Sequence, residues 1–155
     1  LDFLPMTVEG LILLTSDSRY ARWQNRPRIV NNLERGQGFP TPQLEMRWYC
    51  IPMNRPVAQT VVHSPGEETP EGYDVATMAE YLAAKIFHYL LYTGHYERYG
   101  KREYAPYAVC GVSARQEGHS NPVVTQGKQD GLSVGYTSLH SGGHEWFTAL
   151  ARKPE

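Results

Sequence analysis

Residues 74–93 form the one long segment of this chain with clear helical periodicity, and the rest of the fold has to be built around it. At about 100° per residue, the apolar side chains of this segment gather on one broad face. The members of this predicted core face are Val75, Met78, Ala79, Leu82, Ile86, Tyr89 and Leu90. A wide apolar helix face is stable only when other elements bury it, so we expect strands to cover it.

The opposite side of the predicted helix carries a polar stripe. Its members are Thr77, Glu80, Tyr81, Lys85, His88 and Tyr92. Residues three or four positions apart share a helix face, so the four from Tyr81 to Tyr92 are expected to lie nearly in line and to meet water or a partner. Asp74 suits the N-cap or the first turn, and Gly94 suits the left-handed position that ends many helices.

Length and hydrophobic content predict a single domain over residues 1–155. A chain of 155 residues with 41% hydrophobic content can bury one ordinary core. The net charge of -1 gives no general attraction to nucleic acid or to an acidic membrane, so any such contact must be local. The apolar N-terminal run is interrupted by charged residues and a proline and has no basic leader. We therefore expect neither a signal peptide nor a membrane span, and no membrane partner.

The two cysteines, Cys50 and Cys110, lie in apolar runs without the spacing of a metal site. A disulfide framework normally needs more bridges, so both are expected to be buried free thiols in a reducing compartment. This predicts a cytoplasmic protein. The sequence contains no phosphate-cradling glycine loop, dinucleotide fingerprint or zinc-protease motif, so no metal and no cofactor are expected.

The fold class predicted by these patterns is α+β. Strand candidates are residues 10–15, 44–51, 57–63 and 107–115. Residues 116–131 are expected to form a long polar loop. Only one long helix is available for crossovers, which disfavours a parallel α/β sheet. We expect a mostly antiparallel sheet packed on the helix of residues 74–93, with a β-hairpin over residues 132–152.

The predicted hairpin brings two histidines together. Two strand-like runs are separated by Ser-Gly-Gly, a three-residue hairpin loop, and its register places His140 opposite His144. Directly opposite Cβ atoms lie about 5 Å apart, so the two imidazoles could share a metal, clamp a phosphate, or act as acid and base. Metal is the weaker interpretation, because paired histidines at this spacing normally lie one turn apart on a helix.

Two functional interpretations of this histidine pair stay open. One neutral and one charged imidazole beside a cation could support a metal-independent phosphotransfer enzyme, such as a ribonuclease. Alternatively, His140 and His144 are surface residues at a hairpin tip with no chemical role. The sequence leaves open whether the protein is an enzyme.

A basic and aromatic segment lies near the N-terminus. Its candidate binding residues are Arg19, Arg22, Trp23, Arg26 and Arg28, with Tyr20 between them. Such a mixture can pair phosphates while an aromatic ring stacks on a base, which predicts a contact with an anion or with single-stranded nucleic acid. The alternative is a solvated loop beside the core.

Opposite charges gather in two other stretches of the sequence. Residues 67–80 carry five acidic residues and no basic one, whereas residues 16–35 are rich in arginine. Surfaces of opposite sign can join two copies of a chain, so a homo-oligomer is expected. The preferred function is a non-catalytic binding or assembly module that engages nucleic acid or protein partners through the Arg/aromatic segment and the charged surfaces.

The six residues 135–140, Gly-Tyr-Thr-Ser-Leu-His, resemble the G-Y-x-S-L-H strand of the guanosine tetraphosphate synthetases. In that family the tyrosine stacks on the guanine of the acceptor, which the resemblance would assign to Tyr136. The chain departs from the family at Val134, where the family has asparagine, and it lacks the downstream E-I-Q-I-R-T strand and the upstream D-x-x-G-x-R motif. These departures remove the metal and transfer machinery, so the family is not assigned.

Overall fold

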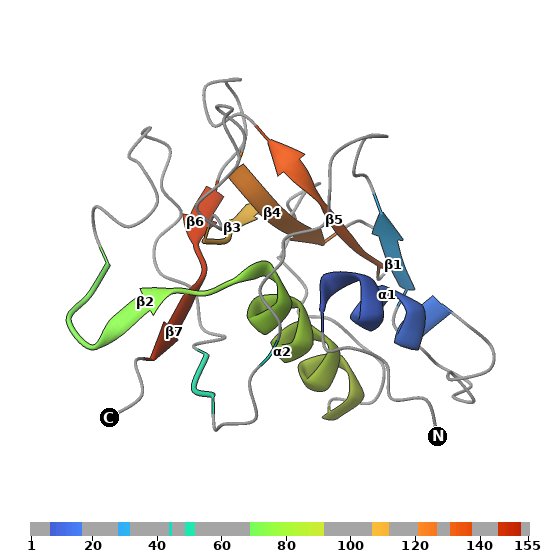
Figure 1. The fold of residues 1–155 in the computed structure, drawn as a ribbon, viewed down its shortest axis with the longest axis horizontal. Helices are drawn as coiled ribbons and strands as arrows, with labels where there is room; N and C mark the ends of the chain where they lie inside the picture. Colours follow the sequence, from blue (N-terminus) through green and yellow to red (C-terminus); the bar gives the residue numbers. More distant parts are fainter. Residues whose placement is uncertain are drawn as a thin grey trace, which may run out of the picture.

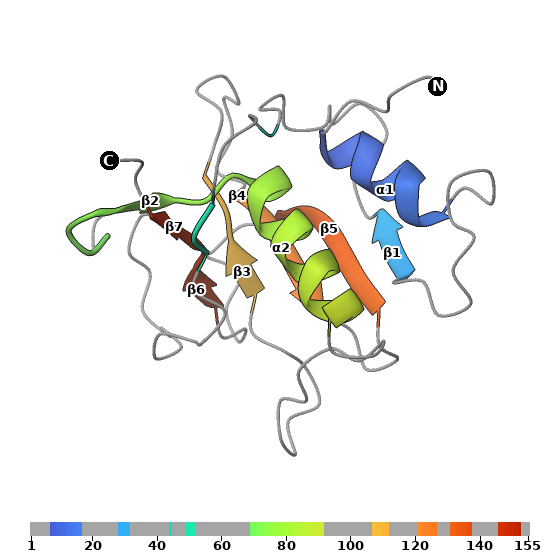
Figure 2. The same ribbon diagram turned by 90° about the horizontal axis from the view of Figure 1, so that it is seen from below.

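The computed structural model describes residues 7–16, 28–31, 44, 49–51, 69–91, 107–111, 121–126, 131–137 and 146–152. The elements in chain order are α1 (Val8–Ser16), β1 (Arg28–Asn31), β2 (Tyr73–Val75), α2 (Met78–Leu91), β3 (Tyr107–Val109), β4 (Asn121–Gln126), β5 (Gly131–Thr137), β6 (Trp146–Thr148) and β7 (Leu150–Arg152). Both helices lie along the same face of the larger sheet, as the two views in Figures 1 and 2 show. Neither helix within these ranges is long and apolar enough to cross a membrane.

The larger sheet has the strand order β1-β5-β4-β3-β6, and the smaller sheet pairs β2 with β7. Strand β4 runs antiparallel to both of its neighbours, β3 and β5. The outer ladders, β1 with β5 and β3 with β6, are parallel. The fold is therefore α+β, but its larger sheet is mixed and not mostly antiparallel.

The structure does not confirm the hairpin expected over residues 132–152, because β5 and β6, which the structure describes in this range, do not pair with each other. Strand β5 lies between β1 and β4, so both of its edges are occupied, and β6 pairs with β3. The antiparallel neighbour of β5 is β4, with Val124 opposite Val134. Strand β4 lies inside residues 116–131, which were expected to form a polar loop. The strand was not predicted because its buried apolar residues, two valines and a proline, form too short a run to indicate a strand.

Helix α2 begins at Met78, four residues later than expected, because Asp74 and Val75 belong to β2. Thr77 caps the helix in place of Asp74. The amide of Glu80 donates to Thr77 Oγ1 at 3.2 Å, and the amide of Thr77 donates to Glu80 Oε2 at 2.8 Å. This reciprocal capping box satisfies two amides that the first helical turn leaves without partners. The structure describes α2 as far as Leu91.

The N-terminal strand expected at residues 10–15 is instead helix α1. The amide of Gly10 donates to Thr7 Oγ1 at 3.1 Å at the start of this helix. The hydroxyl of Thr15 donates to the carbonyls of Leu11 and Ile12 in its last turn. A short continuous apolar run fits a buried strand and a buried helix equally well, so its periodicity could not separate the two.

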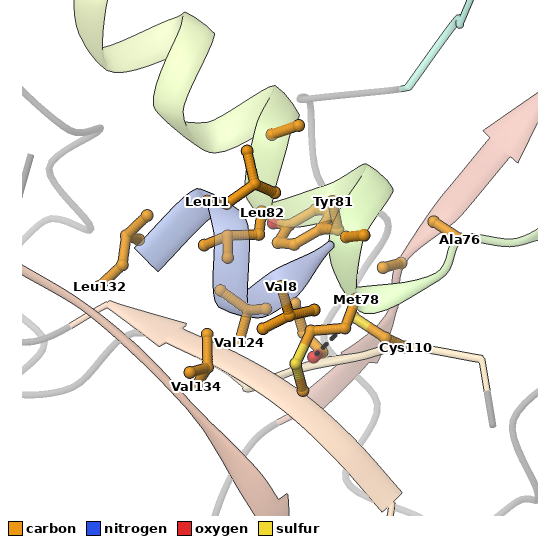
Figure 3. Packing of buried hydrophobic residues seen from close by; sticks show 14 of the residues in the cluster. Val8, Leu11, Ala76, Met78, Tyr81, Leu82, Cys110, Val124, Leu132 and Val134 are labelled. Atoms are coloured by element: carbon orange, nitrogen blue, oxygen red, sulfur yellow. Dashed lines mark hydrogen bonds between the residues drawn. The ribbon is translucent and has the colours of Figure 1, made fainter. Parts of the chain in front are cut away.

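The hydrophobic core lies between the two helices and the facing side of the larger sheet (Figure 3). Met78, Ala79, Leu82, Ile86 and Tyr89 are all buried, which confirms the predicted core face of α2 along most of its length. The sheet and α1 cover this face with the buried side chains of Val8, Leu11, Cys110, Val124, Leu132 and Val134. The prediction is wrong at two positions: Val75 belongs to β2 and is half-buried, and Leu90 has 41% of its surface exposed.

A junction of backbone hydrogen bonds joins the two sheets to the start of α2. Ala149, between β6 and β7, donates from its amide to the Val109 carbonyl at 2.8 Å and accepts from the Ala76 amide at 2.8 Å. The Ala76 carbonyl in turn accepts from the Gly111 amide at 2.8 Å. Gly111 is closely packed, because a Cβ there would lie 3.3 Å from the Val75 carbonyl oxygen. The junction fixes where α2 enters the core.

Of the remaining strand candidates, residues 57–63 lie outside the described ranges. Leu44 and residues 49–51 are described and are not in a strand. The Cys50 carbonyl nevertheless accepts a hydrogen bond from the Arg152 amide at 2.9 Å, so this stretch lies beside β7. Residues 107–115 contain a strand at their start, β3.

Candidate functional site

The two predicted catalytic histidines lie outside the described residues. His140 follows the end of β5 by three positions, and His144 precedes β6 by two. These strands are separated by β4 and β3 in the sheet, a lateral distance of roughly 14 Å at about 4.8 Å per strand. The described parts of β5 and β6 are therefore not paired with each other, and the predicted pairing of His140 with His144 stays a prediction.

Most of the predicted Arg/aromatic site also lies outside the described residues, namely Arg19, Arg22, Trp23 and Arg26. Arg28 is the first residue of β1, where its backbone pairs with Gly131. Strand β1 is an edge strand of the larger sheet. The basic segment thus leads directly into the edge of the sheet.

The polar line expected on the outside of α2 is wrong at two of its positions. Tyr81 is only 4% exposed and Lys85 only 3%. At about 100° per residue, Lys85 falls between Tyr81 and Tyr89 around the helix, on the side that meets the core. Its Nζ lies 6.0 Å from the centroid of the Tyr81 ring, within reach of a cation–π attraction. The long alkyl stem of a lysine can cover apolar surface in such a place.

The Tyr81 ring has an aromatic neighbour on the sheet. Its centroid lies 6.2 Å from that of Phe147 in β6, with an interplanar angle of 68°. This edge-to-face geometry is the arrangement that aromatic quadrupoles favour. Lys85, Tyr81 and Phe147 therefore tie α2 to the β6 edge of the sheet, which is a structural role.

The acidic segment, residues 67–80, divides between surface and interior. Glu71 and Asp74 are exposed, whereas Glu80 is only 9% exposed and serves the capping box of α2. Glu67 and Glu68 lie outside the described residues. The carboxylate of Glu80 is therefore not part of an outward acidic surface, contrary to the expectation from charge order alone.

The two cysteines differ in exposure. Both are free thiols, but Cys50 is exposed and Cys110 is fully buried, so the expectation of two buried thiols is correct only for Cys110. Burial, reinforced by the nearby Glu80 carboxylate, raises the pKa of the Cys110 thiol well above its usual range. The Cys110 thiol faces the Ala108 carbonyl, with Sγ 3.8 Å from its oxygen. Only the thiolate is a good nucleophile, and the raised pKa keeps Cys110 protonated at neutral pH. Cys110 is therefore expected to be unreactive in the folded protein.

We expect a disulfide exchange reagent to modify one cysteine of the native protein rapidly and the other slowly. Cys50 should react first because it is exposed to solvent. Cys110 should react only when local unfolding exposes its thiol. The measurement is the absorbance of the released thiolate over time, with Cys50→Ser as the control that should remove the rapid phase. Two rapid phases in the native protein would contradict the burial of Cys110.

Within the part of the chain that the structure describes, no group of three or more histidine, cysteine, aspartate or glutamate side chains could hold a metal ion. The buried charged residues in this part, Glu80 and Lys85, lie in the helix cap and beside an aromatic ring. Neither arrangement has the form of a catalytic site.

The end of α2 exposes a group of large apolar side chains. Phe87 is 62% exposed, Leu91 is 77% exposed and Leu90 is 41% exposed. We call these three residues the apolar surface of α2. The sequence contained the signal for it: Phe87 and Leu91 lie four positions apart and nearly opposite Met78 around the helix, away from the predicted core face. The sequence analysis did not predict this surface, because it assigned one apolar face to the core and expected the opposite face to be polar.

Comparison with protein-family models, with curated proteins and with solved structures finds no match to this chain. Its function therefore has to be inferred from its own residues and their arrangement.

Proposed function

We propose that this chain is a non-catalytic binding and assembly module, and that its apolar surface of α2 holds another protein chain. The exposure of Phe87 and Leu91 is the observation that carries the proposal. Large apolar side chains that gather on one exposed face typically mark an interaction site, because their burial in a complex removes apolar area from water.

The chemistry of this surface favours a protein partner over nucleic acid. The helical neighbours of Phe87 are Ala83, Ala84, Leu90 and Leu91, and none of them carries a charge. Nucleic acid is held mainly by cations that neutralise its phosphates. The cores of protein interfaces, by contrast, are depleted in charge and enriched in aromatic side chains.

A photo-crosslinking amino acid at position 91 tests the proposal in the cells that produce the protein. Irradiation should give an adduct of one discrete mass, because a specific partner covers this position. The control carries the same amino acid at position 9, since Glu9 is exposed on α1 outside the apolar surface. Adduct formation at neither position, or the same spread of masses at both, would remove the support for a specific partner.

The Arg/aromatic segment supports a second contact, with single-stranded nucleic acid, because it leads into β1 at the edge of the sheet. If it binds phosphates, replacing Arg22 and Arg26 by alanine should weaken binding of a labelled single strand. The slope of log affinity against log salt should fall by about one or two, since each phosphate contact releases roughly one counterion. The measurement is a fluorescence-anisotropy titration over a salt series. No binding by the parent protein at low salt would contradict it.

The phosphotransfer alternative, with His140 and His144 as acid and base, stays a second proposal. It requires the two imidazoles to meet beyond the ends of β5 and β6, which are not neighbours in the larger sheet. A cytoplasmic location belongs to the proposal for the binding module, since a free buried thiol at Cys110 suits a reducing compartment.

A further inference from the structure

We draw no further inference here: the strongest candidate, the apolar surface at the end of α2 formed by Phe87, Leu90 and Leu91, already carries the proposed function, and nothing in the structure shows what covers it.

Discussion

Replacing Leu82 by alanine is expected to lower the free energy of unfolding by about 3 kcal/mol. Leu82 is fully buried between α1, α2 and the sheet, so the shorter side chain leaves a cavity that the core cannot fill. Truncations of this kind typically cost about 2 to 5 kcal/mol. For a chain of this size, a loss of about 3 kcal/mol corresponds to a fall in melting temperature of roughly 6 to 12 °C.

Thermal and urea unfolding followed by circular dichroism measure this loss. Leu13→Ala is the control, because it removes the same atoms from a leucine that is 39% exposed on α1. The control should cost less than about 1 kcal/mol, since less apolar area returns to water. Equal stabilities for the two variants would mean that α2 does not pack on the core through Leu82.

The second large effect is expected at Gly111, in the junction between the sheets and α2. A Cβ at this position would lie 3.3 Å from the Val75 carbonyl oxygen and 3.7 Å from Val75 Cγ1. The two methyl groups of a valine have to enter the same space. We expect Gly111→Val to cost about 2 kcal/mol, within the range of about 1 to 3 kcal/mol for overpacked sites.

Comparing the stabilities of Gly111→Ala and Gly111→Val separates the cost of crowding from the cost of replacing glycine by any other residue. Gly111→Ala requires a shift of only a few tenths of an ångström, so it should cost less than the valine variant. Crowding at Gly111 also strains its hydrogen bond to the Ala76 carbonyl, so amide exchange at position 111 should quicken in the valine variant. A valine variant as stable as the parent would show that the junction is not closely packed.

Helix α2 was predictable because fourteen residues with a wide apolar arc leave few alternatives. Its start was misplaced because Asp74 and Thr77 are both good caps, and the pairing of β2 with β7 decided between them. That pairing joins residues far apart in the sequence, so local propensity carries no information about it. Helix α1 was missed for a different reason, since a short run of aliphatic residues has no distinctive period.

The hairpin prediction is not confirmed, because a glycine-rich break between two strand-like runs carries no information on which strands become neighbours. Strand β5 has its partner β4 close by in sequence and β1 far away. The predicted histidine site at His140 and His144 lies outside the described residues and stays a prediction. Lys85 was misassigned because its charge suggested water, although its angular position lies on the core side of the helix.

The parallel ladder between β1 and β5 shapes the order in which this protein can fold. It joins Arg28 to Gly131, so the chain must close a loop of roughly a hundred residues before β1 can dock. During synthesis, β1 leaves the ribosome long before its partner strand β5 exists. We therefore expect α2 and the β4–β5 pair to form early, and β1 to join late and slowly, as is usual for ladders between distant segments. Until β1 docks, the edge of β5 is open to pairing with other chains, so aggregation is expected to compete with folding at this stage.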